Sequence, residues 1–200
     1  VGDFFAAATD ARRIEALRFA PVEPLLARIG RAGGREEIAA IISELHLEGV
    51  EPLFSWYVEA DERHSGVYAL HLVQGGLSLP ERAYYLEDDF AEVREKFSRH
   101  IARMFVLAGD DAAAAARAAA TMLRFETALA RASKPAEALN DSEANYHKLT
   151  IAGLEKTAAG FPWTAFLRDV GAHTEDVIAG QPEFLTAMAR AFATEPLDTL

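Results

Sequence analysis

Apolar residues recur every three to four positions along most of this 200-residue chain, a pattern typical of helices with one buried face. The clearest case is the stretch of residues 89–108, which we expect to form one long helix. Its apolar face consists of Phe90, Val93, Phe97, Ile101 and Phe105. Gly109 then ends the helix, and Asp111 can cap a second long helix that extends to about residue 132. Because the connection is so short, we expect the two helices to pack antiparallel.

Shorter helices are predicted before and after this pair. Their starts are marked by capping residues, by acidic first turns or by proline, which a helix tolerates in its first turn. We place these starts near Asp10, Pro24, Glu36, Thr150, Pro162 and Pro182. The fold class is therefore mainly α, a bundle-like lobe of many helices. No internal repeat or domain boundary is evident, so we expect residues 1–200 to form a single lobe.

One stretch departs from the helical pattern. Residues 53–58 and 67–74 are rich in β-branched and aromatic side chains, and the polar segment 60–66 between them ends in glycine. This arrangement predicts a β-hairpin, followed by a turn at Gly75–Gly76. We expect the hairpin to be the only substantial β element, with Val177–Ile178 as a short extended piece. A lone hairpin is marginally stable in water, so it should pack against the helices.

Composition narrows the classes of function. The net charge is −11, which disfavours binding to nucleic acid or to an anionic membrane surface. The absence of cysteine excludes disulfide bonds, thiolate metal ligands and a cysteine nucleophile. No apolar run approaches the roughly 18 residues of a transmembrane segment. The chain begins at Val1 in the middle of an apolar pattern and has no signal peptide, so we expect it to be a fragment cut at both ends.

Residues that could carry out catalysis are scarce. A helix that binds catalytic zinc commonly carries His-Glu-x-x-His, but none of the six histidines is followed by Glu and no two are four positions apart. A Gly-x-Ser-x-Gly nucleophile elbow is also absent. The acidic run Glu87–Asp89 is expected to cap a helix, and Asn140–Ser142 is a glycosylation sequon that we expect to be unused. We therefore predict no catalytic residue and no metal ligand in this chain.

Each histidine has a structural interpretation instead. His46 lies near a helix end, where it can extend to the solvent or interact with the last carbonyl groups. His71 alternates with two leucines in its strand, so it should point to a polar surface or to an interface with a helix. His64 is expected in a solvated turn, and His100 at the boundary of a helix face. His147 and His173 are expected in loops, each with local hydrogen bonds.

Residues 74–85, which read QGGLSLPERAYY, resemble the "QGGLGLPxRDYY" run of the neprilysin and endothelin-converting-enzyme family of zinc metallopeptidases, which includes bacterial oligopeptidase-O-type enzymes. Ser78 replaces the usual Gly and Ala83 the usual Asp. Residues 145–150 are similar to the family's "YNxMT" step, with His147 and Leu149 as departures. Further family-like stretches are 11–17, 24–26, 180–184 and 195–197, so the resemblance covers almost the whole chain.

The resemblance implies that the chain is the amino-terminal helical lobe of a zinc metalloendopeptidase that cleaves short peptides. Zinc and its general-base Glu would then lie in a carboxy-terminal lobe that this chain lacks. Residues 1–200 would form the amino-terminal lobe, which caps the active site and controls which substrates enter. No substrate-binding residue is transferred to this chain, and none is assigned. The isolated chain should be inactive and should self-associate through an apolar face that normally contacts the other lobe. The bacterial branch and a periplasmic or secreted location are also implied.

An alternative from a different class stays open. The chain could be a stand-alone helical module that binds peptides or proteins and has no enzyme attached. Composition and periodicity do not separate the two hypotheses. The reading frame past Leu200 would, because a downstream His-Glu-x-x-His indicates a peptidase and a stop codon indicates a module.

Overall fold

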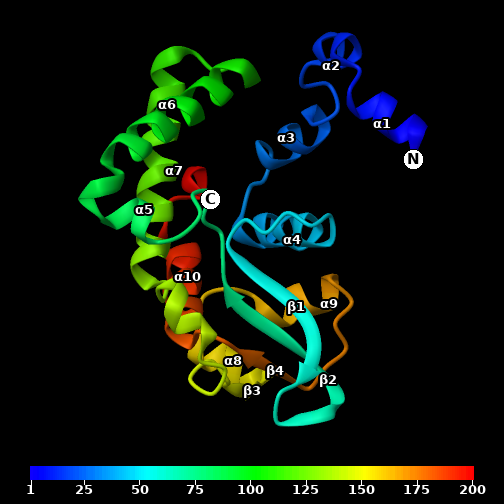
Figure 1. The fold of residues 1–200 in the computed structure, drawn as a ribbon, viewed down its shortest axis with the longest axis vertical. Helices are drawn as coiled ribbons and strands as arrows, with labels where there is room; N and C mark the ends of the chain where they lie inside the picture. The colour runs from blue at the N-terminus through cyan, green and yellow to red at the C-terminus, as the bar shows by residue number, and fades with distance from the viewer. The chain divides into compact units, whose positions relative to one another are not determined.

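The computed structural model describes all 200 residues, which form two compact units, residues 1–33 and residues 34–200 (Figure 1). The chain is mainly α-helical, as predicted, with ten α-helices and one small sheet. None of these helices combines the length and the apolarity that a membrane crossing requires. The expectation of a single lobe stays a prediction, and each unit is described by itself.

The first unit consists of three short helices, α1 (Gly2–Ala8), α2 (Ala11–Leu17) and α3 (Glu23–Ile29). Asp10 caps α2, since its Oδ1 accepts a hydrogen bond from the N–H of Arg13 at 3.0 Å. No residue of these helices is buried. Large apolar side chains are instead exposed: Phe4, Phe5, Ile14, Leu17, Val22, Leu26 and Ile29. The apolar pattern of this segment therefore forms helices without closing a core around them.

The second unit contains the remaining helices and the sheet. Its α-helices are α4 (Arg35–Leu47), α5 (Ala83–Leu86), α6 (Ala91–Ala108), α7 (Ala112–Ala132), α8 (Ile151–Thr157), α9 (Trp163–Asp169) and α10 (Pro182–Thr194). Its strands are β1 (Phe54–Asp61), β2 (His64–Gln74), β3 (Lys148–Thr150) and β4 (Asp176–Ala179). Short 3-10 helices occur at η1 (Asp88–Phe90), η2 (Ala136–Asn140) and η3 (Leu197–Thr199).

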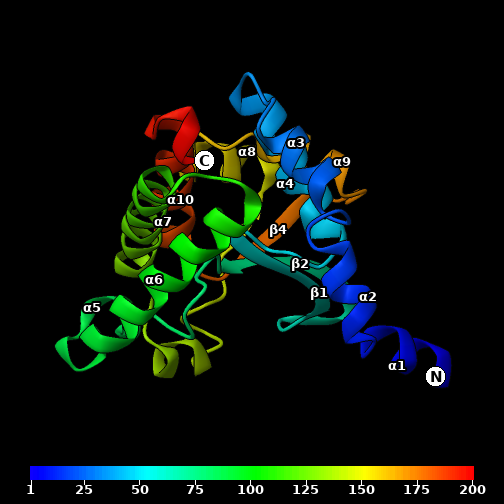
Figure 2. The ribbon, with the colours of Figure 1, turned by 90° about the horizontal axis from the view of Figure 1, so that it is seen from above.

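The two long helices form the predicted pair. Helices α6 and α7 lie side by side, joined through Gly109 and the two aspartates that follow it (Figures 1 and 2). Gly109 has φ of 120°, a conformation that only glycine adopts without strain. Asp111 caps α7 as expected, with Oδ1 accepting hydrogen bonds from the N–H groups of Ala113 and Ala114 at 2.8 Å each. Small side chains, among them the buried Ala115 and Ala119, line the inner face of α7.

The β-hairpin forms as predicted, but it is longer and it is not alone. Strands β1 and β2 pair antiparallel, with Trp56 opposite Leu72, and the sheet has the order β1-β2-β4-β3. Strand β4 pairs parallel with β2 and antiparallel with β3. The expected extended piece at Val177–Ile178 lies within β4, and the sequence did not predict β3 or the pairing of both strands with the hairpin. Strands of three and four residues are too short to display a period, and their partners lie far away in the sequence.

An aromatic cluster forms the core on one face of the hairpin. Phe54 lies at its centre, with its ring centroid 5.5 Å from Phe161, 5.1 Å from Trp163 and 5.0 Å from Phe166. Trp163 is completely buried, and its indole N–H donates a hydrogen bond to the carbonyl of Ala158 at 2.8 Å. The cluster connects the start of β1 to α9 and to the loop before it, so the hairpin is held by the helices that follow it.

Candidate functional site

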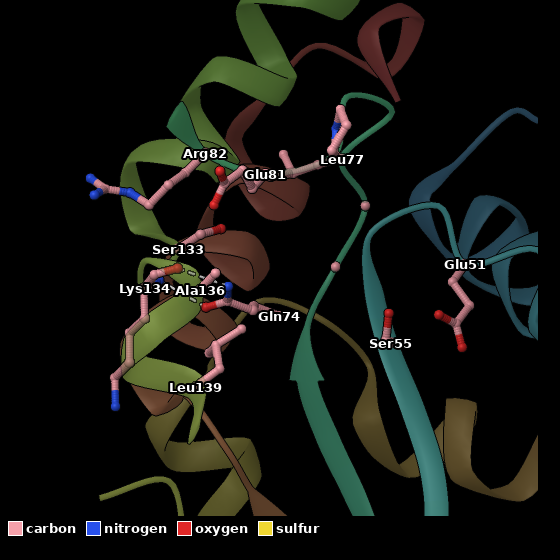
Figure 3. Close-up of a pocket in the computed structure, with 13 residues that line it drawn as sticks. Glu51, Ser55, Gln74, Leu77, Glu81, Arg82, Ser133, Lys134, Ala136 and Leu139 are labelled. Carbon is pink, nitrogen blue, oxygen red and sulfur yellow. Dashed lines mark hydrogen bonds between the residues drawn. The ribbon is translucent and has the colours of Figure 1, made fainter. Parts of the chain in front are cut away.

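The segment that follows β2 borders a cavity of about 360 Å³ (Figure 3). Three parts of the chain meet there: the start of β1, the turn and α5 entrance after β2, and the loop after α7. Its lining includes Ser55, Gly75, Leu77, Glu81, Ser133 and Leu139. A cavity of this size is large enough for a small ligand or for one or two residues of a peptide.

Two glycines allow the chain to pass close to β1 at this cavity. A Cβ atom on Gly75 would lie 2.5 Å from Ser55 Oγ and 2.7 Å from Ser55 N. Gly76 has φ of 70°, and a Cβ atom there would lie 2.7 Å from the carbonyl oxygen of Leu53. Any larger residue would therefore meet backbone atoms as well as conformational strain. The turn predicted at this position is confirmed, and its glycines are explained by close approach.

We expect Gly76→Ala to lower the free energy of unfolding by about 1–3 kcal/mol, since it adds both the strain of positive φ and a clash with the Leu53 backbone. Urea denaturation followed by circular dichroism would measure this. Gly66→Ala is the matched control, because Gly66 lies in the hairpin, has no atom within 4 Å of the added Cβ and should change stability by about 0.5 kcal/mol or less. Equal effects of the two substitutions would contradict the prediction.

Gln74 fixes the position of this segment by reciprocal hydrogen bonds. Its Nε2 donates to the carbonyl of Lys134 at 3.0 Å, and its Oε1 accepts from the Lys134 N–H at 2.8 Å. The Gln74 N–H donates to Oε1 of the buried Gln181 at 2.9 Å. The first residue of the family-like run thus connects β2 to the loop after α7 and to the start of α10.

A buried carboxylate on α7 accepts hydrogen bonds from the same segment. Glu126 of α7 accepts hydrogen bonds from the Tyr85 hydroxyl at 2.5 Å and from the Ser78 hydroxyl at 2.7 Å. The Tyr85 oxygen in turn accepts from the Leu79 N–H at 2.8 Å. Burial, followed by the hydrogen bond to Glu126, raises the pKa of Tyr85 well above its usual value, so the phenol stays protonated and donating. Ser78, which replaces the family's usual Gly, therefore uses its side chain as a donor.

The charged side chains around the cavity point in different directions, some toward the cavity and some away from it. Lys134 Nζ donates to the carbonyl of Ala144 at 3.2 Å and to Asn145 Oδ1 at 3.1 Å. Figure 3 shows the Lys134 and Arg82 side chains extending away from the cavity, whereas the Glu81 carboxylate points toward Ser133. The inner lining is therefore acidic and polar beside its leucine side chains.

The cavity has the parts of a binding site and lacks a catalytic set. No histidine lines it, and the Ser133 hydroxyl donates to the Leu129 carbonyl at 3.0 Å. Nucleophilic catalysis by serine needs a base that accepts the proton of the hydroxyl, whereas the Ser133 hydroxyl donates to a backbone carbonyl. Nowhere in the chain do three or more His, Cys, Asp or Glu side chains gather as a metal site, so the residues present do not fit zinc.

The structure corrects the interpretation of two histidines. His46 is buried, with its ring centroid 4.7 Å from that of Phe54 and 5.1 Å from that of Phe166. Neither of its ring nitrogens has a hydrogen-bond partner, so the predicted interaction with helix-end carbonyls was wrong. His71 is also buried and stacks on Tyr57 at 4.7 Å, so the polar surface, one of its two expected environments, was wrong. Helix and strand positions alone do not reveal aromatic rings that arrive from other elements.

The remaining histidines lie where the sequence placed them or on the surface. His64 is exposed, as predicted, but it is the first residue of β2 and not part of the turn, and its backbone N–H donates to Asp61 Oδ1 at 3.1 Å. His147 Nδ1 lies 3.1 Å from the carbonyl oxygen of Ala179, which is 32 positions away on β4, so the expectation of a local hydrogen bond was wrong. His100 and His173 are exposed.

Besides Glu126, a second buried carboxylate was missed by sequence analysis. Asp61 ends β1 and is completely buried, although its position beside a turn suggested a solvated residue. Its carboxylate accepts hydrogen bonds from Lys148 Nζ at 3.0 Å, from the Tyr146 hydroxyl at 3.0 Å and from the Arg63 N–H at 2.9 Å. Burial opposes ionisation, but these hydrogen bonds outweigh it and hold the pKa of Asp61 well below its usual range. Because Tyr146 and Lys148 lie more than 80 positions away in the sequence, no local pattern around Asp61 predicts its burial.

Family comparison agrees with the resemblance carried by the segment after β2. The N-terminal model of peptidase family M13 matches residues 1–200, the whole chain. The chain therefore belongs to peptidase family M13. Endothelin-converting enzyme 1 from Cavia porcellus is 30% identical over 178 residues, which cover 84% of this chain and 23% of that enzyme.

Solved structures show the same fold in two bacterial proteins. The zinc metalloprotease Zmp1 of Mycobacterium tuberculosis, in complex with an inhibitor, has a TM-score of 0.93 and 30% identity, covering 99% of this chain and 31% of its own. PepO from Lactobacillus rhamnosis HN001 shares the fold with a TM-score of 0.73 at 21% identity, over 93% of this chain and 30% of its own. The chain thus spans about a quarter to a third of the length of these relatives.

Proposed function

We propose that this chain is the amino-terminal lobe of a zinc-dependent metalloendopeptidase that cleaves short peptides, and that it caps the active site and limits which substrates enter. The match of the family's N-terminal model to the whole chain carries this proposal. The zinc and the general base belong to a carboxy-terminal lobe, the missing partner of this chain. The contribution of residues 1–200 is then steric, and the reaction takes place on the other lobe.

Two observations support a gating role. The relative Zmp1 has been solved in an open state and in a partially open state, as well as with an inhibitor, so that protein adopts more than one degree of opening. The second unit of this chain is held by a dense aromatic core and by buried polar networks, as a lobe that moves as one body requires. A rigid cap over an enclosed site admits short, flexible peptides and excludes folded proteins.

The gating role can be tested on the full-length gene product. A free peptide of about ten residues should be cleaved at least 100-fold faster, as kcat/KM, than the same peptide displayed as a loop of a folded carrier protein. The control is a peptidase with an open active-site cleft, which should cleave both substrates at more similar rates. Equal cleavage of the two substrates by the full-length protein would contradict gating, while cleavage of either one would still support the peptidase assignment.

We expect the isolated chain to self-associate, because the first unit exposes apolar side chains such as Phe4, Phe5 and Ile14. Light scattering should show a mass that rises with protein concentration. The double variant Phe4→Glu, Ile14→Glu should shift the mass toward the monomer, whereas the charge-matched variant Ala113→Glu, Ala116→Glu on the exposed side of α7 should not. A chain that stays strictly monomeric at high concentration would contradict the expectation.

A further inference from the structure

Strand β1 has an open edge. In the sheet order β1-β2-β4-β3, β1 pairs with β2 alone (Figure 1). In an antiparallel pair, alternate residues of an edge strand direct their N–H and C=O groups away from the partner. Pairing with β2 alone leaves the outward-facing groups of Ser55–Ala60 without a partner strand. The other edge strand, β3, has only three residues.

This edge lacks the features that usually block strand addition. Edge strands are commonly protected by proline, by lysine or by an irregularity that twists the edge away. Residues 54–60 contain neither proline nor lysine, and the only irregularity is the register shift between Ala60 and Asp61. Tyr57 and Val58 are 44% and 60% exposed, and Glu59 is exposed too. Within the regular run 55–59, residues 57–59 are therefore exposed, and Ser55 and Trp56 are half-buried.

The surroundings of the edge are acidic. Glu59 follows Tyr57 on the same face of β1, and Glu62 approaches that face, with its Oε1 4.0 Å from His71 Nδ1. Burial raises the pKa of the Tyr57 hydroxyl, and the negative charges of Glu62 and Glu59 raise it further. The nearby cations are engaged elsewhere. Arg63 lies over the ring of Tyr146, with 4.3 Å between its Cζ and the ring centroid, and Lys148 pairs with the buried Asp61 at 3.0 Å.

We propose that the outer edge of β1, residues 55–59, binds an extended peptide segment with basic side chains, which adds a strand to the sheet. Backbone hydrogen bonds to the outward-facing groups would supply affinity without sequence specificity. The carboxylates of Glu59 and Glu62 would select lysine or arginine at the positions of the peptide that face them. This site lies within the second unit and stands independently of the proposed function, because it needs no zinc lobe.

Edge-to-edge pairing with a second copy of the chain is the competing occupant. Antiparallel pairing of two β1 edges would bring two copies of the same acidic edge together, and a register centred on Glu59 would place the two Glu59 carboxylates opposite one another. Like charges directly opposite one another destabilise a pair of strands. The charge around the edge therefore favours a basic peptide over self-pairing.

The experiment uses a fluorescein-labelled hexapeptide, Val-Lys-Val-Lys-Val-Lys, and the complete 200-residue chain at low salt. Fluorescence anisotropy should show saturable binding. A peptide of equal charge in which proline replaces each valine should bind at least tenfold more weakly, because proline lacks the N–H donor and resists the strand conformation. Hydrogen exchange should slow on binding within residues 54–60 and not in α6 or α10.

Protein variants test the charge requirement separately. Glu59→Lys should weaken binding of the hexapeptide at least fivefold, and Glu183→Lys, an exposed glutamate on α10, should weaken it less than twofold. Both sites are exposed, and thermal unfolding confirms that the variants remain folded. The proposal is overturned if the proline peptide binds equally well, if Glu59→Lys and Glu183→Lys act alike, or if protection appears outside β1. If the hexapeptide does not bind, sedimentation shows a dimer and hydrogen exchange is slowed in β1 without peptide, the edge pairs with a second copy instead.

Discussion

Replacing Phe54 with alanine is expected to lower the free energy of unfolding by about 3–5 kcal/mol, the range observed for large aromatic residues removed from well-packed cores. Phe54 is completely buried, and its ring contacts those of His46, Phe161, Trp163 and Phe166. Its loss would leave a cavity at the junction of β1 with α4 and α9. Because no residue of α1–α3 is buried, the cooperative transition should report on residues 34–200.

Tyr68→Ala is the control for this substitution. Tyr68 is an aromatic residue of the same hairpin but is 80% exposed, so its removal should cost about 0.5 kcal/mol or less. Guanidinium denaturation of the three proteins, followed by tryptophan fluorescence, measures both effects. A cost below about 1 kcal/mol for Phe54→Ala, or equal costs for the two variants, would show that the aromatic cluster does not hold the hairpin to the helices.

Replacing His46 with phenylalanine is expected to remove part of the pH dependence of stability. Burial lowers the pKa of His46 to about 4, although the negative charge of Glu51 partly opposes this shift. The unfolded chain, in which the histidine pKa is about 6.5, therefore binds more protons than the folded chain between pH 4 and 6.5. The contribution of the neutral His46 to the free energy of unfolding is therefore fully present above about pH 6.5 and is lost as the pH falls toward 4.

The expected loss from His46 between pH 7.5 and pH 5 is about 2 kcal/mol. The measured quantity is the change in unfolding free energy between these two pH values, from urea titrations of wild type and His46→Phe. Any packing cost of the larger ring acts equally at both pH values and cancels in this difference. His173→Gln, which alters an exposed histidine, should keep the wild-type pH dependence. An unchanged pH dependence in His46→Phe would contradict the buried, unpartnered state of the imidazole.

Sequence patterns predicted the elements whose signals are local. Helix α6, the glycine that ends it and the cap at Asp111 each depend on residues a few positions apart, and each was found as expected. Of the predicted apolar stripe, however, only Ile101 is buried, and Val93 is exposed. The hairpin could be predicted for the same reason, since alternation, aromatic content and a polar turn lie within 22 residues, 53–74.

The parts that could not be predicted depend on long-range pairing. Strand β4 joins the sheet beside β2 across about 100 positions, and Asp61 meets Tyr146 across 85. Glu126 lies on a helix, where a glutamate usually faces water, and only the folded chain brings the Tyr85 and Ser78 hydroxyls to it. His46 was misjudged because three aromatic residues from β1 and α9 enclose it. In each case the partners, and not the residue itself, determine its environment.

The cavity beside the Gly75–Gly76 turn also combines a part that the sequence predicted with a part that only the fold revealed. The family-like run 74–85 drew attention to this segment from sequence alone. Its partners, the start of β1 and the loop after α7, became apparent only from the fold. The glycines are required by the Leu53 and Ser55 backbone, and Gln74 by its two hydrogen bonds to Lys134. The run is thus explained by packing between elements, in agreement with a structural role for this lobe.

Zinc content and peptide hydrolysis, measured side by side on the 200-residue chain and on the full-length gene product, test the central claim most directly. The account predicts about one zinc per full-length molecule and cleavage of a short quenched fluorescent peptide, with no bound zinc and no cleavage for residues 1–200. Stoichiometric zinc bound by the 200-residue chain, or hydrolysis by it that a chelator abolishes, would contradict the account.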